Sequence, residues 1–183
     1  MTREIGKYAF VLALIFGGAL FFVRLQDRKG WGLRTGEPAP NLVVTDFASG
    51  KDVSLESYRG KLVLVNFWGT FCGPCVAEMP SLERLYETLA PEGLVVLGVS
   101  VDSEGPEVQN FVTARKIRFT ILRDPGGAAS ARAYRTTGYP ETYVIGPTGT
   151  LLESYVGPAE WDTPEAIAHF RDLLKSAKTS PTR

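Results

Sequence analysis

Two cysteines, Cys72 and Cys75, stand three residues apart in the motif Cys-Gly-Pro-Cys, and the 183-residue chain has no others. Cysteines this close in sequence can form a redox pair that alternates between dithiol and disulfide, or can supply half of a metal site. A zinc site needs four ligands, and the chain adds only one histidine, His169, far along the sequence. We therefore expect thiol–disulfide chemistry, with no metal and no cofactor.

The place of the pair in the chain gives its two members different tasks. Cys72 follows the apolar run 62–67, which predicts a strand buried on both faces, and precedes a helical repeat over 73–89. At a helix N-terminus, free N–H groups and the helix dipole stabilise a thiolate, so we expect the pKa of Cys72 to lie below about 8.5. Pro74 suits the first helical turn, and Cys75 lies one turn inside, where it can resolve a mixed disulfide on Cys72.

Strands and helices alternate along the rest of the chain. Strands are expected at 42–45, 53–55, 62–67, 94–101, 119–122, 141–145 and 151–156, and helices at 73–89, 106–115, 128–134 and 163–175. The last two strands flank a Gly-Pro-Thr-Gly turn and predict an antiparallel hairpin. This order of elements indicates an α/β sandwich around a mixed sheet.

A second signal is the segment Gly138-Tyr139-Pro140, which puts a proline at the start of the predicted strand 141–145. A proline at a strand start is ordinary when it is taken alone. Together with the two cysteines it matches the thioredoxin fold, in which a loop with a cis-proline faces the Cys-x-x-Cys motif and offers a free backbone edge to a substrate peptide. We therefore expect the Tyr139–Pro140 bond to be cis.

Two stretches, NFWGTFCGPCVAEMPSL at 66–82 and GYPETYVIGPTGTLLESYVG at 138–157, resemble the membrane-anchored thioredoxin-like proteins of the TlpA/ResA/DsbE (CcmG) group. The resemblance covers about residues 36–175. It implies a thioredoxin-like α/β fold with a mixed central sheet and an N-terminal β-extension, preceded by one transmembrane helix. Residues 140–142 are closer to the DsbE branch and residues 157–161 to the TlpA branch, so both branches stay open.

The same resemblance implies roles for single residues. Cys72 matches the nucleophilic cysteine and Cys75 the resolving cysteine, and the two form the redox-active disulfide. Glu78 matches a glutamate that tunes these cysteines. The residues expected to contact the substrate are Phe71, Gly73, Pro74, Tyr139 and Pro140.

Two positions depart from cytosolic thioredoxin, which carries a buried aspartate six residues before its first cysteine and a tryptophan directly before it. Here these places hold Asn66 and Phe71. Because asparagine cannot act as a proton acceptor, acid–base help must come from Glu78 or from water. Glu78 lies three residues after Cys75 and on the same side of the predicted helix. The alternative is that Glu78 only compensates the helix dipole.

The front of the chain predicts a membrane anchor. Residues 5–23 are apolar apart from Lys7 and would reach about 28 Å as a helix, close to the thickness of a hydrocarbon core. A cleaved signal peptide and a buried core helix are the alternatives, but no clear small-x-small cleavage site follows the apolar run. We expect a membrane anchor at 1–26, a linker at 27–35, the thioredoxin-like domain at 36–177 and a flexible tail at 178–183.

Charge and resemblance together narrow the function. Twenty basic and twenty acidic residues cancel, so nothing indicates a nucleic-acid partner. The resemblance implies a thiol:disulfide oxidoreductase on the periplasmic side of the membrane that reduces client disulfides. Its expected client is apocytochrome c, during cytochrome c maturation, with the cysteines of a metal centre as the alternative client, and its expected electron donor is a membrane thiol-transfer protein. The basic residues that flank the span weakly favour the opposite orientation, but a long domain can translocate regardless of such charges.

Two other functions stay open. A peroxiredoxin-like peroxidase would share the surrounding fold, but the proline expected before its single reactive cysteine is missing here, and Cys75 is added. A non-enzymatic carrier would hold Cu(I) between Cys72 and Cys75.

Overall fold

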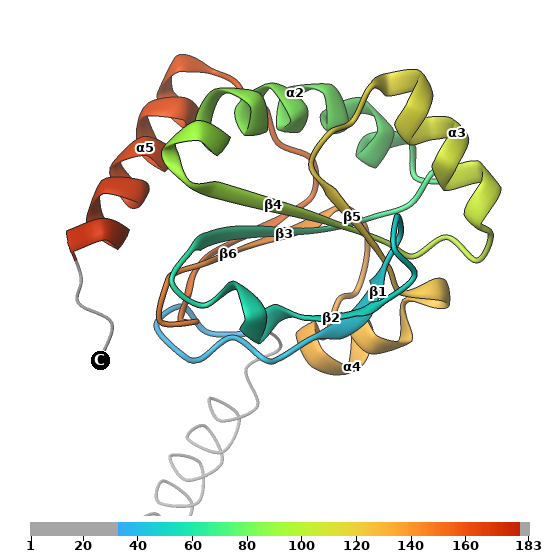
Figure 1. Cartoon of the computed structure of the whole chain (residues 1–183), viewed down its shortest axis with the longest axis horizontal. Coiled ribbons are helices and arrows are strands. Elements are labelled where there is room, and N and C mark those ends of the chain that lie inside the picture. The colour runs from blue at the N-terminus through green and yellow to red at the C-terminus, as the bar shows by residue number, and fades with distance from the viewer. Residues whose placement is uncertain (1–32, 180–183) are drawn as a thin grey trace, which may run out of the picture. The chain divides into compact units, whose positions relative to one another are not determined.

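A seven-stranded mixed sheet forms the centre of the computed structural model, which describes residues 33–179 (Figure 1). The strands are β1 (Val43–Asp46), β2 (Asp52–Ser54), β3 (Leu62–Trp68), β4 (Leu94–Ser100), β5 (Thr120–Arg123), β6 (Glu141–Ile145) and β7 (Leu151–Val156). The helices are α2 (Gly73–Leu89), α3 (Gly105–Arg115), α4 (Ala128–Tyr134) and α5 (Pro164–Thr179), with short 3-10 helices η1 (Leu55–Tyr58), η2 (Ala90–Glu92) and η3 (Pro125–Gly127).

The strands lie in the order β2-β1-β5-β4-β3-β6-β7. β3, β4 and β5 run parallel, whereas β6 is antiparallel to β3 and β7 is antiparallel to β6. On the other side, β1 and β2 form an antiparallel hairpin beside β5. The expected mixed sheet, N-terminal β-extension and β6–β7 hairpin are therefore confirmed.

The central strand β3 is buried along its whole length because both of its faces are covered. Leu64 and Trp68 pack in the core on the α2 side of the sheet, and Val65 and Phe67 pack in the core on the α4 side. Asn66 falls between Leu64 and Trp68 in this alternation, so the polar side chain of the strand faces α2.

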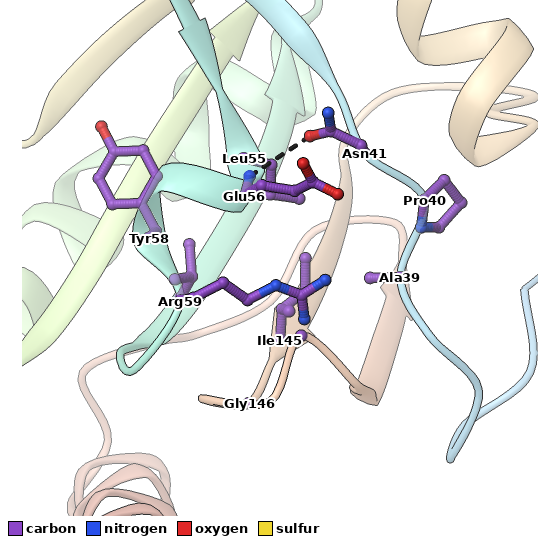
Figure 2. Close-up of a pocket in the computed structure, with 11 residues that line it drawn as sticks. Ala39, Pro40, Asn41, Leu55, Glu56, Tyr58, Arg59, Ile145 and Gly146 are labelled. Atoms are coloured by element: carbon purple, nitrogen blue, oxygen red, sulfur yellow. Dashed lines mark hydrogen bonds between the residues drawn. The ribbon is translucent and has the colours of Figure 1, made fainter. Parts of the chain in front are cut away.

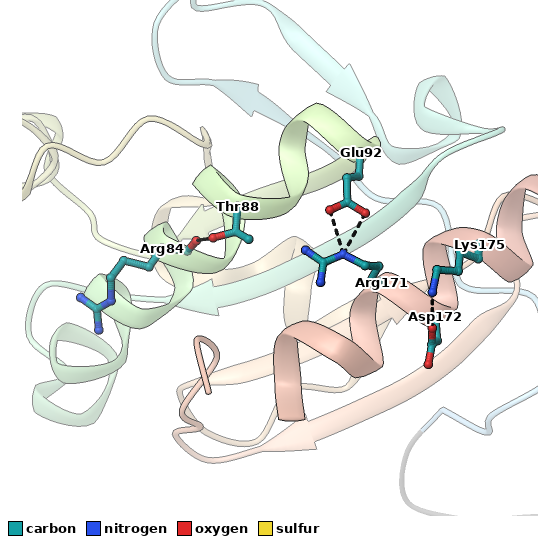
Figure 3. Close-up of polar contacts among 6 residues, drawn as sticks. All are labelled: Arg84, Thr88, Glu92, Arg171, Asp172 and Lys175. Atoms are coloured by element: carbon teal, nitrogen blue, oxygen red, sulfur yellow. Dashed lines mark hydrogen bonds and ion pairs between the residues drawn. The ribbon is translucent and has the colours of Figure 1, made fainter. Parts of the chain in front are cut away.

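Helices α2, α3 and α5 cover one face of the sheet and α4 covers the other (Figure 1). The repeat along α2 presents an apolar face to the sheet. The fully buried residues of that face include Met79, Leu82, Leu85 and Leu89. α5 closes the same side with Phe170 and Leu174, and its Arg171 Nε binds both carboxylate oxygens of Glu92 at 2.9 and 3.1 Å (Figure 3).

The predicted boundaries agree with the structure within one residue, except at the end of α5. That helix was expected to end at Lys175, but it continues to Thr179. The Ser176 hydroxyl donates to the Asp172 carbonyl at 2.9 Å, and the Thr179 hydroxyl donates to the Ser176 carbonyl at 3.0 Å. These hydroxyl groups are satisfied by carbonyls of their own helix, so the polar residues after Lys175 are compatible with helix up to Thr179.

The predicted membrane span 5–23 lies outside the described residues. Within residues 33–179, no helix is both long enough and apolar enough to cross a membrane. At the start of this region, Leu33 packs against the core on the α4 side, and the Gly36 N–H donates to the Leu151 carbonyl at 2.8 Å. The chain is therefore in contact with the domain from the last residues of the predicted linker onward.

Leu85→Ala should lower the free energy of unfolding by about 3 kcal/mol, because the side chain is fully buried and its truncation leaves a cavity under α2. Val43→Ala, on the exposed side of β1, should cost less than about 1 kcal/mol. Urea unfolding of the oxidised protein measures both values. Equal losses in the two variants would mean that α2 does not supply this part of the core.

Candidate active site

Cys72 and Cys75 form a disulfide at the start of α2, with their Cα atoms 5.3 Å apart. Cys72 is the N-cap residue of the helix, and its Sγ accepts the Cys75 N–H at 3.2 Å. Cys72 is half-buried, whereas Cys75 is fully buried. One accessible sulfur and one sheltered sulfur match the division that thiol–disulfide exchange requires.

The loop before β6 faces this disulfide. The Tyr139–Pro140 bond is cis, as the sequence predicted, and the Tyr139 carbonyl oxygen lies 3.4 Å from Cys72 Sγ. The rings of Phe71 and Tyr139 meet edge-on, with their centroids 6.5 Å apart. Because Phe71 is 69% exposed, this aromatic pair reaches the surface beside the sulfur of Cys72.

The other sequence-predicted residues fall in two places. Gly73 and Pro74 are exposed on the first turn of α2, next to Cys72, so the structure gathers all of the expected substrate-contacting residues at one end of the sheet. His169 lies elsewhere, on α5, where its Nε2 is 2.8 Å from Glu153 Oε1. This histidine therefore lies on the surface, paired with Glu153.

A pocket lies at the opposite end of the sheet, where β3 begins and β6 ends (Figure 2). Glu56 and Arg59 line it, and Figure 2 shows both side chains extending toward the segment 39–41. The Glu56 N–H donates to Asn41 Oδ1 at 3.3 Å. Neither cysteine lines this pocket, so it has no part in the redox site.

Glu78 is buried in the second turn of α2, with only 4% of its surface exposed. Its Oε1 accepts Asn66 Nδ2–H at 2.8 Å. Its Oε2 accepts the Trp161 indole N–H at 3.1 Å and the Ala159 N–H at 3.0 Å. One carboxyl group therefore joins α2 to β3 and to the segment that follows β7.

Burial raises the pKa of Glu78, and the hydrogen bonds from Ala159, Asn66 and Trp161 counter this effect only in part. A residue that only compensates the helix dipole would lie exposed in the first turn. Glu78 is neither exposed nor in that turn, so the dipole does not explain its place. A buried carboxyl group on the Cys75 side of the helix is suited to exchange a proton with that cysteine.

The partners of Glu78 were missed by reasoning from the sequence. Trp161 and Ala159 come from the segment Gly-Pro-Ala-Glu-Trp after β7, which stood out as a motif without an assigned role. Thr142, on β6, accepts a second hydrogen bond from Asn66 Nδ2 at 2.9 Å. No pattern in the sequence links these residues to Glu78, because their contact depends on how the strands are paired.

Known proteins share this fold and this chemistry. A model of the AhpC/TSA family matches residues 35–154. The thiol-disulfide oxidoreductase ResA of Bacillus cereus is 33% identical over 149 residues, which cover 80% of this chain and 85% of that protein. Two solved thiol:disulfide interchange proteins are similar in structure. One, a thioredoxin family protein from Chlorobium tepidum TLS, has a TM-score of 0.62 and 28% identity and covers 79% of this chain and 97% of its own. The other, from Bacteroides sp., has a TM-score of 0.68 and 25% identity, and the match covers 80% of this chain and 94% of that protein.

Glu78→Gln should make the stability of the oxidised protein less sensitive to pH. Because folding raises the pKa of Glu78, its protonated form contributes stability that is fully present below the ordinary pKa and is lost as the pH rises through the raised pKa. Glutamine cannot ionise, and once the Asn66 amide turns over, its Nε2 can donate to Asn66 Oδ1, which accepts no hydrogen bond in the parent. The fold should therefore survive the substitution.

Urea unfolding of parent and variant at a series of pH values from about 4 to about 8 measures this effect. The free energy of unfolding of the parent should fall more steeply with rising pH than that of Glu78→Gln. The control Glu107→Gln changes an exposed carboxylate on α3. Parallel curves for Glu78→Gln and the parent would show that the carboxyl group of Glu78 does not titrate in this range.

Proposed function

The chain belongs to the AhpC/TSA family and is a thiol:disulfide oxidoreductase, and from this basis we propose that it reduces disulfides of client proteins outside the cytoplasm. The observation that carries the proposal is the position of Cys72. Its half-buried sulfur caps the N-terminus of α2 and lies 3.4 Å from the Tyr139 carbonyl oxygen. A client chain can reach this sulfur, and the helix end stabilises its thiolate.

The first step of the reaction takes place at Cys72. Its thiolate attacks one sulfur of the client disulfide and forms a mixed disulfide, while the other client sulfur leaves as a thiolate and takes up a proton. Before the attack, the Cys75 N–H stabilises the Cys72 thiolate, because it donates to Sγ at 3.2 Å. The client segment lies along the exposed residues beside Cys72 and Tyr139.

The second step releases the client. Cys75 loses its proton, and its thiolate attacks Cys72 Sγ, which frees the second client thiolate and leaves the Cys72–Cys75 disulfide. Two electrons have then passed from the dithiol to the client. Because Cys75 is fully buried, its proton needs an acceptor within the protein, and Glu78 on the same side of α2 serves as that acceptor.

The surface around the dithiol supports a protein as the client. Among the described residues, the exposed large hydrophobic side chains are Val43, Phe71 and Val156. Two of these three flank the site. Phe71 directly precedes Cys72, and Val156 pairs in register with Glu141, the residue after Pro140. Exposed apolar side chains gathered beside a reactive group indicate an interaction surface.

We propose apocytochrome c as the client and a membrane thiol-transfer protein as the electron donor. The support is the resemblance of residues 36–175 to the TlpA/ResA/DsbE group, together with redox chemistry. A compartment that forms disulfides also oxidises cysteine pairs that must stay reduced, so such pairs need a dedicated reductant. Each cycle leaves the Cys72–Cys75 disulfide, which a dithiol donor has to reduce again.

We also propose that residues 5–23 form an uncleaved membrane anchor and that a linker at 27–35 carries the domain of residues 36–177 on the periplasmic side. The apolar run and its basic flanks support the anchor. The periplasmic orientation is supported by the thiol chemistry of a tethered domain. In this orientation, both a membrane electron donor and a translocated client protein can reach the sulfur of Cys72.

Cys75→Ser in the full chain should hold clients on Cys72 as mixed disulfides, because the resolving thiolate is missing. We expect haem-protein precursors with a Cys-x-x-Cys-His motif to dominate when trapped proteins are separated without reductant and identified. The control Cys72→Ser leaves only the buried Cys75 and should trap none. A trap that lacks such precursors would remove apocytochrome c from the proposal, and equal trapping by Cys72→Ser would overturn the assignment of the attacking sulfur.

After a membrane-impermeant reductant has released clients bound to Cys72, a membrane-impermeant maleimide added to intact spheroplasts should label Cys72 in the Cys75→Ser variant, because the proposed orientation puts this thiol outside. A cytoplasmic protein with an exposed cysteine serves as the control for intact membranes. Labelling that appears only after the membrane is permeabilised would place the domain in the cytoplasm and contradict the orientation.

A further inference from the structure

Asp102 is a buried carboxylate that follows β4 and contacts the loop in front of Cys72. Only 2% of its surface is exposed. Its Oδ1 accepts the Thr70 N–H at 3.0 Å and the Thr70 hydroxyl at 2.5 Å. Its Oδ2 accepts the same N–H at 3.1 Å and the Ser100 hydroxyl at 2.8 Å. The carboxylate therefore holds both the backbone and the side chain of Thr70.

Thr70 is the second residue of a four-residue turn that ends at Cys72. The Cys72 N–H donates to the Gly69 carbonyl at 3.1 Å and closes this turn. The ring of Phe71 folds back over Gly69, where an added Cβ would lie only 2.6 Å from a ring atom. The carboxylate of Asp102 therefore binds this turn, and the ring of Phe71 lies close to its first residue.

This turn is the covalent link between the end of β3 and the sulfur that caps α2. The Cys75 N–H donates to the Cys72 sulfur at 3.2 Å and, with the helix end, stabilises its thiolate. A shift of the turn would move the sulfur away from this N–H and from the end of the helix, and would weaken that stabilisation. A buried carboxylate also costs free energy unless hydrogen bonds compensate it, and here the turn supplies most of those bonds.

We infer that Asp102 is a positioning residue for the exchange reaction: it holds the turn of residues 69–72 so that Cys72 Sγ stays at the N-terminus of α2. The inference rests on the proposed role of Cys72 as the attacking sulfur. Asp102 acts through Thr70 and does not touch the client or the sulfurs.

Two substitutions of Asp102 separate the effect of its hydrogen bonds to Thr70 from the effect of its negative charge. Alanine removes every hydrogen bond to Thr70, whereas asparagine keeps one oxygen that can accept the Thr70 N–H, and both remove the same charge. In the Cys75→Ser background, iodoacetamide at neutral pH should alkylate Cys72 about tenfold more slowly in Asp102→Ala than in Asp102→Asn, because the reagent reacts with the thiolate and a displaced sulfur loses the stabilisation that the helix end gives to its thiolate. No client is present, so this result does not depend on the identity of the client, and failure of the trapping experiment would leave it intact.

Thr70→Val and Thr70→Ser test the same contact without changing Asp102. Valine has the shape of threonine but no hydroxyl group, whereas serine keeps the hydroxyl group that donates to the carboxylate. We expect slower alkylation of Cys72 in Thr70→Val and recovery in Thr70→Ser. This pair also keeps the test decisive if Asp102→Ala does not fold, which thermal unfolding of each variant would reveal.

Glu83→Ala is the matched control, because Glu83 is another buried carboxylate that accepts a backbone N–H, that of Arg118 at 3.0 Å. It lies further along α2, away from the turn, and its loss should change the alkylation rate by less than about twofold. Equal rates in Asp102→Ala and Asp102→Asn would assign the effect to charge and overturn the inference. An effect of the same size in Glu83→Ala would overturn it as well, because it would show a general loss of stability.

Discussion

The junction between β3 and α2 is the constraint on which the rest of the structure depends. β3 is paired on both sides, with β4 and β6, and is buried on both faces, so its end cannot move independently of the core. α2 is fixed by an apolar face packed on the same sheet. A residue at this junction is therefore held rigidly and yet remains accessible, which is what a reactive thiol in position 72 requires.

Buried carboxyl groups hold the loops that meet at this end of the sheet. Glu78 accepts the N–H of Ala159, Asp102 accepts that of Thr70, and Glu141 accepts that of Thr137 at 3.1 Å. Loops cannot satisfy their N–H groups within a strand or a helix, and a carboxylate has room for several donors. The loops around the dithiol thus gain fixed positions without regular secondary structure, and these bonds offset part of the free-energy cost of burying each carboxyl group.

The polar groups and the apolar groups of the site have separate tasks. Glu78 and Asn66 form a buried network on the α2 side, near the resolving cysteine, where water has little access. Phe71, directly before Cys72, and Val156, paired with the residue that follows Pro140, are exposed. Under the proposed function, the apolar side chains face the client while Glu78 takes up the proton of Cys75 inside the fold.

The sequence alone determined those features that short segments encode. The boundaries of α2, α4, β6 and β7 were predicted at both ends, because apolar periodicity and nearby glycines and prolines act over a few residues. The relation of Cys72 to Cys75 was also predicted, since one helical turn fixes it. The extension of α5 to Thr179 was missed, because the apolar periodicity that marks the helix stops before the polar residues that follow Lys175.

Only the tertiary structure decided which residues surround the dithiol. Glu78 could be placed on the Cys75 side of α2, but its burial and its bonds to Trp161 and Ala159 depend on where the chain returns after β7. Asp102 reaches Thr70 because β3 and β4 are parallel neighbours whose ends meet at one edge of the sheet. Contacts between residues far apart in sequence form when the whole sheet is assembled, and no local pattern of residues specifies them.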